Sequence, residues 1–189
     1  LSYVPEMLQG ELKSLPKMDE LQQMALDLFG EKADVDEELL YRSSGNSGGC
    51  RPKCLLQDEE GSWIVKFRHT YDPMDMGRME WHYNDVARRC GIDVPDFKLI
   101  DDCYFATKRF DVVDGVRYHI ITAAAILGVS HQEPTLDYSV LLNLTGWLTQ
   151  SPKEVEQMFR RMVFNVLAKN RDDHAKNFTF LYNEGEDRW

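Results

Sequence analysis

Apolar residues recur with helical spacing in several segments of this chain, which predicts amphipathic helices. The first segment ends at Gly30 and the second at Gly91, and glycine commonly terminates helices. Residues 138–148 form a third helical segment. The apolar positions of the first two helices are Leu21, Met24, Ala25 and Leu28, and then Met76, Met79, Tyr83, Val86, Ala87 and Cys90.

A fourth helix is predicted to begin after Ser151. Serine is a favoured N-cap, Pro152 suits the first helical position, and Glu154 would complete a capping box. The apolar stripe of this helix is wide, so we expect it to be a central core helix. Its members are Val155, Met158, Phe159, Met162, Val163, Val166 and Leu167.

Short apolar runs bounded by turn residues predict the strands. Two pairs of such runs flank a turn, which predicts two hairpins, and a last strand precedes a turn near the end of the chain. The runs are residues 54–56 and 63–67 around Asp58–Gly61, residues 104–108 and 118–122 around Asp114–Gly115, and residues 178–182 before the turn at 183–186.

The order of these elements gives a strand-rich first half that contains one helix, followed by a helical second half. This layout predicts an α+β protein with two lobes around a cleft. We expect a helical segment at residues 1–40, a strand-rich N-lobe at 41–110 and a helical C-lobe at 111–189, with the lobe boundary near Lys108–Phe110.

Composition narrows the class of protein. The chain has 189 residues, of which 43% are hydrophobic, and a formal net charge of −10 from 22 Lys+Arg against 32 Asp+Glu. An acidic chain lacks the basic surface for direct nucleic-acid binding. No apolar run reaches the roughly 18–20 residues that cross a bilayer, and the first residues lack the features of a signal peptide. We therefore expect a cytoplasmic protein that contacts neither nucleic acid nor membrane directly.

The four cysteines, Cys50, Cys54, Cys90 and Cys103, are expected to be free thiols in a reducing compartment. The spacing of Cys50 and Cys54 resembles half of a zinc site. No second Cys/His pair supplies the four ligands that structural zinc requires, so free thiols are the favoured interpretation.

The segment after the fourth helix concentrates Asp172, Asp173, His174, Lys176 and Asn177 in six positions. The spacing Asp172-x-x-x-x-Asn177 suits phosphoryl transfer. One carboxylate can accept the proton of an attacking hydroxyl, and a carboxamide oxygen one turn later can bind the Mg²⁺ that accompanies ATP. The alternative is a polar helix-to-strand loop built from Asx turns.

The loop before the first hairpin is rich in glycine. Gly45, Gly48 and Gly49 would let backbone N–H groups approach phosphates, and Arg51 or Lys53 would add positive charge. The pattern is neither a Walker A motif nor G-x-G-x-x-G, so a flexible surface loop is the alternative. The hairpin that follows directly is where a phosphate-covering loop should join its strands.

Lys66 interrupts the apolar run that begins at Trp63. Strand alternation places it on the face of Ile64, opposite Trp63 and Val65. It is either an exposed edge residue or a cleft lysine that faces phosphates. Glu80 lies on the apolar side of the following helix, and a buried glutamate needs a partner, so we predict a Lys66–Glu80 pair.

Together these features follow the order glycine-rich loop, strand lysine, helix glutamate, core helix and Asp/Asn loop, which is the order of a protein-kinase-like fold. The chain resembles the HipA-like serine/threonine kinases, toxins of bacterial toxin–antitoxin systems. The matching motifs, between about Ser43 and Phe180, are the phosphate loop Ser47–Lys53, the segments Gly91–Pro95 and Lys108–Asp111, and the catalytic loop formed by Phe164–Asn165 and Asn170–Phe178.

The resemblance implies a kinase that uses ATP and Mg²⁺ to phosphorylate a serine or threonine of a protein. Asp172 would be the catalytic base, His174 and Lys176 would shape the site, and Asn177 would bind Mg²⁺. The remaining implied roles are phosphate contact by Lys66 paired with Glu80, phosphate covering by Gly48, Gly49, Cys50, Arg51, Pro52 and Lys53, and adenine contact by the hinge residues Lys108, Arg109 and Phe110.

The resemblance also implies partners. Family members phosphorylate a serine of their own phosphate loop, and Ser43, Ser44 and Ser47 are equal candidates here. The protein substrate would be an aminoacyl-tRNA synthetase by analogy with relatives, and an antitoxin protein would be a further partner.

The chain departs from the family pattern at its end. Family kinases carry a second metal-binding Asp after the catalytic loop, and this sequence stops at Trp189 before such a residue. We therefore expect a C-terminally truncated kinase with an incomplete C-lobe and weak or absent activity. One alternative is an inactive kinase fold that binds a nucleotide or a partner. Another is a lipid kinase, which the lack of a basic membrane-facing patch disfavours.

Overall fold

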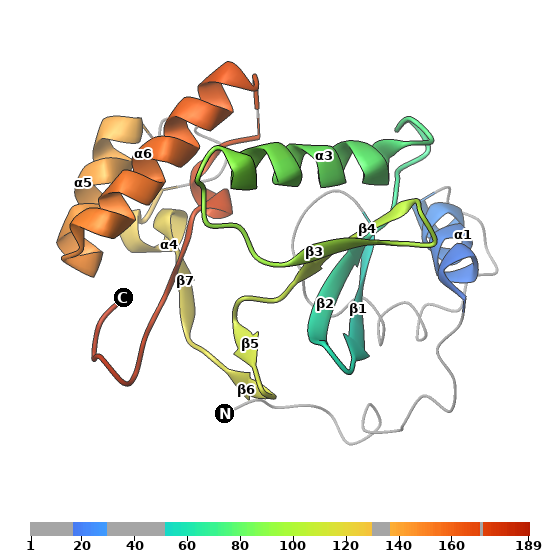
Figure 1. Ribbon diagram of the computed structural model, residues 1–189, viewed down its shortest axis with the longest axis horizontal. Helices are drawn as coiled ribbons and strands as arrows, with labels where there is room; N and C mark the ends of the chain where they lie inside the picture. The colour runs from blue at the N-terminus through green and yellow to red at the C-terminus, as the bar shows by residue number, and fades with distance from the viewer. Residues whose placement is uncertain (1–16, 30–51, 130–136, 171) are drawn as a thin grey trace. The chain divides into compact units, whose positions relative to one another are not determined.

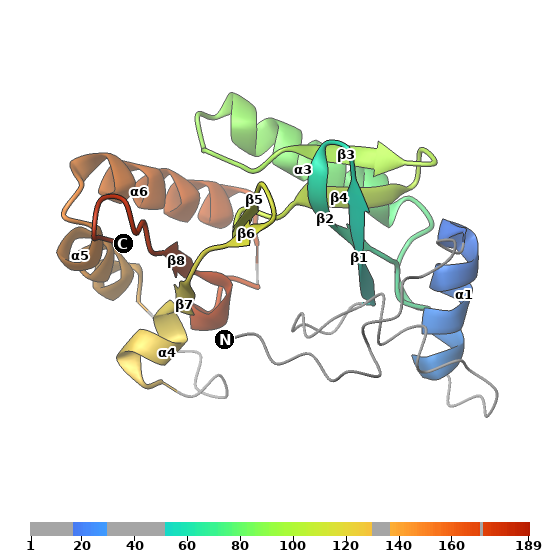
Figure 2. The same ribbon diagram turned by 90° about the horizontal axis from the view of Figure 1, so that it is seen from below.

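The computed structural model describes residues 17–29, 52–129, 137–170 and 172–189 (Figures 1 and 2). The helices are α1 (Met18–Phe29), α3 (Met76–Arg89), α4 (Ala123–Leu127), α5 (Tyr138–Thr149), α6 (Pro152–Leu167) and a 3₁₀ turn, η2 (Ala175–Asn177). The strands are β1 (Lys53–Asp58), β2 (Gly61–Lys66), β3 (Phe97–Ile100), β4 (Tyr104–Lys108), β5 (Val112–Val113), β6 (Val116–Arg117), β7 (Ile120–Thr122) and β8 (Thr179–Leu181).

The chain forms two compact units. The first unit consists of residues up to His82 together with Asp96–Lys108, and the second consists of Tyr83–Pro95 together with Arg109–Trp189. The division therefore passes through α3 and falls again between β4 and β5. Each unit has its own group of buried apolar side chains.

The first unit is built on a four-stranded antiparallel sheet in the order β1-β2-β4-β3. The β1–β2 hairpin turns at Asp58–Gly61, as the sequence predicts. In the middle of the sheet Val65 lies between Cys54 and Ala106 in register. Side chains alternate across each strand, so one face of the sheet carries these small and branched residues.

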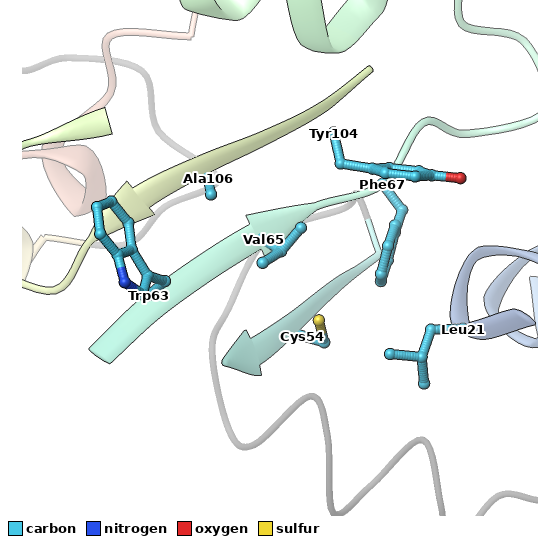
Figure 3. Packing of buried hydrophobic residues seen from close by; sticks show 7 residues of the cluster. All are labelled: Leu21, Cys54, Trp63, Val65, Phe67, Tyr104 and Ala106. Atoms are coloured by element: carbon cyan, nitrogen blue, oxygen red, sulfur yellow. The ribbon is translucent and has the colours of Figure 1, made fainter. Parts of the chain in front are cut away.

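That face forms the core of the first unit (Figure 3). Leu21 of α1 is fully buried against it, and the Tyr104 hydroxyl donates a hydrogen bond to Asp19 of the same helix. The helix is thereby fixed to the sheet through both apolar and polar contacts. The buried members of the cluster are Leu21, Cys54, Trp63, Val65, Phe67, Tyr104 and Ala106.

The opposite face of the sheet packs against α3 (Figure 1). The Trp81 ring meets Phe97 edge to face with a centroid distance of 5.8 Å, and Phe97 lies 6.1 Å from Phe105. These aromatic contacts connect the helix to β3 and β4. Strand alternation also places Lys66 on this face, on the side of α3.

The second unit combines helices with a small β-ladder. Strands β7 and β8 are antiparallel, with Ile121 opposite Phe180, and α4 follows β7 directly. In α5, Gly146 lies close to Val155 of α6, where the two helices pack together. The buried cluster of this unit is Ala123, Leu141, Leu144, Met158, Phe178 and Phe180.

The turn of the second predicted hairpin is present in the structure. The two strands that were predicted to flank it pair with other strands instead. Asp114 and Gly115 both have positive φ, and they join β5 to β6. The predicted partners pair elsewhere, since β4 lies between β2 and β3 and the strand near residue 120 pairs with β8. The partners β2 and β8 lie far along the chain from β4 and β7, and these long-range pairings replace the predicted hairpin. Strand β3 and the short helix α4 were not predicted.

The prediction that the fourth helix is a central core helix is also wrong. Met158 is buried, but Val166 and Leu167 are 65% and 77% exposed. The helix therefore lies at the surface of its unit, with part of its apolar stripe open.

The start of this helix follows the prediction only in part. The Ser151 hydroxyl accepts the Glu154 N–H at 3.4 Å, so serine is the N-cap. The Ser151 N–H donates to the Thr149 hydroxyl at 3.3 Å, which takes the place of the reciprocal contact expected from Glu154.

A charged cluster holds the β1–β2 turn. Lys98 Nζ lies 2.7 Å from Asp58 Oδ2 and 2.6 Å from Glu60 Oε2, above the Trp63 ring. Asp58 Oδ1 also accepts the Trp63 Nε1–H at 2.8 Å. The hydrogen bond from Lys98 is the main reason that the pKa of Asp58 is lowered to about 2.

We predict that Asp58 contributes to stability in an acid-sensitive way. Its pKa in the folded state is below the value of about 3.9 in an unfolded chain. The stabilisation is therefore complete above about pH 4 and is lost as the pH falls toward 2. Urea unfolding across this pH range should show a smaller acid-induced loss in Asp58→Asn than in the wild type. Glu59→Gln, an exposed neighbour in the same turn, is the control and should behave like the wild type.

Candidate active site

Lys66 and Glu80 form an ion pair inside the first unit. Lys66 Nζ lies 2.7 Å from Glu80 Oε2, and the side chains are 38% and 17% exposed. The lysine is the last residue of β2 and also lies 5.4 Å from the centre of the Phe105 ring. The pair predicted from strand alternation and helical phase is therefore present, while its contact with phosphates stays a prediction.

Gly77 sets how closely α3 approaches the sheet, and sequence reasoning missed it. A Cβ atom at this position would lie 1.8 Å from the backbone oxygen of Cys103. Beside it, Arg78 Nε donates to the Asp102 oxygen at 2.7 Å. The first turn of α3 therefore lies directly on the β3–β4 turn, and Glu80 follows one helical turn later. A glycine inside a helix lowers stability by about 1 kcal/mol relative to alanine, so its presence in this helical pattern was the sequence signal for a close packing contact.

An open pocket of about 220 Å³ lies beside the Lys66–Glu80 pair in the first unit. Helix α1 contributes one wall through Asp19 and Gln22, and Arg68 adds a second cation. The remaining lining residues are Phe67, Met74, Met76, Gly77, Cys103, Tyr104 and Phe105. The pocket is thus bounded by α1, α3 and the adjoining ends of β2 and β4.

Pro52 and Lys53, the last residues of the predicted phosphate loop, are described in the structure and lead into β1 of the sheet. The oxygen of Pro52 accepts the Phe67 N–H at 2.9 Å, and Lys53 stands opposite Lys66 in the β1–β2 register. Opposite residues of an antiparallel pair share a face, so both lysines lie on the α3 side of the sheet. The predicted residues Gly48, Gly49, Cys50 and Arg51, and the candidate serines Ser43, Ser44 and Ser47, lie outside the described residues.

The predicted catalytic loop lies in the second unit. Its Asp172 side chain is 82% exposed, and Oδ1 lies 3.1 Å from His174 Nε2. Asn177 Nδ2 donates to the Asp172 backbone oxygen, which joins the two ends of the Asp-x-x-x-x-Asn spacing. The carboxamide nitrogen of Asn177 is thus used within the loop. Lys176 is exposed next to it.

A hydrogen-bond network behind this loop was not predicted. The Tyr138 hydroxyl donates to Asp173 Oδ2 at 2.9 Å and accepts the Asn165 Nδ2–H at 2.9 Å. Asn165 Oδ1 accepts from Asn170 Nδ2 at 3.2 Å, and Asn170 Oδ1 accepts the Asp172 N–H at 3.0 Å. Burial is the main cause that raises the pKa of Tyr138 to about 12, so the hydroxyl keeps its proton.

The predicted hinge residues have separate surroundings. Arg109 Nε and Nη2 donate to the two carboxylate oxygens of Asp111 at 3.0 and 2.5 Å. This hydrogen bonding lowers the pKa of Asp111. Lys108 Nζ lies 6.0 Å from the Trp63 ring, and Phe110 is half exposed. The Arg109 guanidinium is therefore engaged locally, and adenine contact by the hinge stays a prediction.

The structure gathers the candidate residues into two groups. Lys53, Lys66 and Glu80 lie together in the first unit, and the residues of the catalytic loop lie together in the second. Among the described residues, no three His, Cys, Asp or Glu side chains converge as a metal site. No helix in the described ranges is long and apolar enough to span a membrane.

Comparisons with known proteins agree with the class that these features suggest. The family model of the HipA-like C-terminal domain matches residues 45–189. Because this match covers most of the chain, the protein belongs to the HipA-like C-terminal domain family. Helix α1 precedes the matched residues, although it forms part of the core and of the pocket wall.

Two relatives are similar over part of their length. The Sinorhizobium fredii (strain NBRC 101917 / NGR234) protein named "Putative kinase Y4dM" is 30% identical over an alignment of 139 residues, and the alignment covers 65% of this chain and 34% of that protein. The complex of HipA, HipB and operator DNA of the Shewanella oneidensis MR-1 toxin–antitoxin system contains a similar fold. The TM-score is 0.62 at 20% identity, covering 88% of this chain and 46% of that chain. This chain therefore spans less than half of the length of either relative.

The fold comparison supports the predicted mixture of helices and antiparallel sheets, which is similar to HipA. The more detailed description as a kinase-like pair of lobes remains a prediction.

We predict that Gly77→Ala destabilises the first unit by about 1–3 kcal/mol, because α3 must move away from the Cys103 oxygen. The movement should also weaken the Lys66–Glu80 pair. Gly146→Ala in α5 is the matched control, since its nearest neighbour would be a side-chain methyl at 3.4 Å. That change should be neutral or stabilise by up to about 1 kcal/mol. Equal effects of the two alanines in urea unfolding would contradict the close packing of α3.

Proposed function

We propose that this protein transfers the γ-phosphoryl group of ATP to a serine or threonine hydroxyl of a protein substrate. The observation that carries the proposal is the Lys66–Glu80 pair, a strand lysine held at 2.7 Å by a helix glutamate beside an open pocket. A lysine–glutamate pair of this kind positions the lysine on nucleotide phosphates in protein kinases. Membership of the HipA-like C-terminal domain family and the name of the Sinorhizobium relative support a kinase.

The charges on the α3 side of the sheet suit a polyphosphate. Lys53 and Lys66 stand opposite each other in the β1–β2 register, so this face carries two neighbouring cations. Glu80 offsets part of the positive charge and orients Lys66. Bound phosphates would therefore interact favourably with this face, with Lys66 as the direct contact.

The catalytic loop would supply the groups for transfer. Asp172 is exposed and accessible to a substrate hydroxyl, whose proton it would accept. Asn177 would bind Mg²⁺ through its carboxamide oxygen, and oxygen ligands are those that Mg²⁺ prefers. Mg²⁺ commonly uses one or two protein ligands together with substrate phosphates, so this small donor set fits it. The cation would neutralise charge on the phosphates.

The proposed partners follow from the relatives. The Shewanella HipA forms a complex with HipB and operator DNA, so an antitoxin-type protein is the proposed partner of this chain. An aminoacyl-tRNA synthetase is the proposed substrate. Binding of ATP without transfer would instead identify a nucleotide-binding module, the second candidate considered from sequence.

We predict that millimolar Mg-ATP raises the melting temperature of the protein. A ligand at a hundred times its Kd stabilises the folded state by about 2.7 kcal/mol. Lys66→Met should remove most of the rise because the phosphates lose their direct cation. Lys153→Met, at an exposed lysine of α6, should keep it. A rise of equal size in the Lys66 variant would exclude Lys66 from the nucleotide site.

We also predict that Asp172→Asn lowers the rate of phosphoryl transfer by about a hundredfold or more, because the amide cannot accept the hydroxyl proton. Its ATP-dependent rise in melting temperature should match that of the wild type. Transfer of labelled γ-phosphate to the protein itself or to a substrate would be measured. Normal turnover in Asp172→Asn would show that another group is the base.

A further inference from the structure

We propose that Tyr138, Asn165 and Asp173 anchor the catalytic loop, and that the adjacent carboxylates of Asp172 and Asp173 have different roles. Asp173 is a positioning residue, and Asp172 is the reacting carboxylate. The assignment of a reacting carboxylate rests on the proposed function, whereas the anchoring of the loop does not.

The three anchoring residues come from three elements of the second unit. Tyr138 is the first residue of α5, Asn165 lies in the last turn of α6, and Asp173 lies in the loop. The tyrosine ring also meets Phe178 edge to face at 5.9 Å, just beyond η2. The tyrosine thus contacts the loop at Asp173 and again at Phe178.

Asn165 connects the anchor to Asp172 by a second route. Its carboxamide nitrogen donates to Tyr138, and its oxygen accepts from Asn170, which in turn accepts the Asp172 N–H. The backbone oxygen of Asn165 also accepts the Asn170 N–H at 2.9 Å. Asn165 therefore holds the backbone that leads from Asn170 to Asp172 and, through the Tyr138 hydroxyl, the side chain of Asp173.

The carboxylates of Asp172 and Asp173 have different surroundings in this network. Asp173 is partly buried and accepts a hydrogen bond from a hydroxyl that is itself held by Asn165. Asp172 has an exposed side chain whose contact is His174, within the loop. A substrate hydroxyl can reach Asp172 without breaking the anchor, whereas Asp173 would have to release Tyr138.

Conservative substitutions distinguish an anchor from a base. Asp173→Asn keeps an oxygen that can accept from Tyr138, so kcat should stay within about threefold of the wild type. Asp173→Ala and Tyr138→Phe each remove the hydrogen bond and should lower kcat about tenfold, with KM for ATP changed less than twofold. Asp172→Asn should lower kcat by about a hundredfold or more. Loss of turnover in Asp173→Asn, with turnover retained in Asp172→Asn, would overturn the division of roles.

Amide hydrogen exchange tests the anchor even where turnover is absent. Exchange in the peptide that covers residues 172–178 should become about five- to tenfold faster in Tyr138→Phe and Asp173→Ala, and should stay near the wild-type rate in Asp173→Asn. Tyr182→Phe is the matched control, since it removes another Tyr–Asp hydrogen bond, to Asp187, at an exposed turn. Unchanged exchange in Tyr138→Phe would overturn the proposal. Faster exchange in a chain without wild-type turnover would keep the anchor, which does not depend on the proposed function.

Discussion

A partly buried lysine at the end of a strand needs a nearby counter-charge, and this requirement organises the first unit. Glu80 can meet Lys66 only if α3 lies against the sheet at the right height and rotation. Gly77 permits the height, because its missing side chain lets the helix rest on the Cys103 oxygen. The edge-to-face contact of the Trp81 and Phe97 rings fixes the rotation. The geometry of the ion pair therefore depends on close backbone packing at Gly77, one helical turn before Glu80.

The catalytic loop follows a different principle. Its shape depends on a hydrogen-bond network in which Asn165 and Tyr138 each act as both donor and acceptor. The network ends on the Asp173 carboxylate, which accepts the hydrogen bond of the Tyr138 hydroxyl. The exposed carboxylate of Asp172 is thereby left to interact with whatever enters the site.

Sequence patterns predicted the parts of this architecture that depend on local periodicity. Alternation along β2 and the phase of α3 were sufficient to pair Lys66 with Glu80, and the turn at Asp58–Gly61 followed from its residues. The pairing of β4 was mispredicted because one neighbour, β2, is distant in sequence and the other, β3, was not predicted as a strand. Gly77 and Tyr138 were missed for a similar reason, since their roles arise from contacts that only the folded chain creates. Apolar content at Val166 and Leu167 indicated a helix but did not reveal its exposure.

The β7–β8 ladder has a consequence for biosynthesis. Strand β7 leaves the ribosome before α4, α5 and α6, and its partner β8 is made only after all of them. The catalytic loop immediately precedes β8. A nascent chain therefore cannot pair β7 with β8, and so fix the end of the loop, until β8 has emerged from the ribosome. We therefore expect the loop to be among the last parts of this unit to become ordered during translation, after its helices have formed.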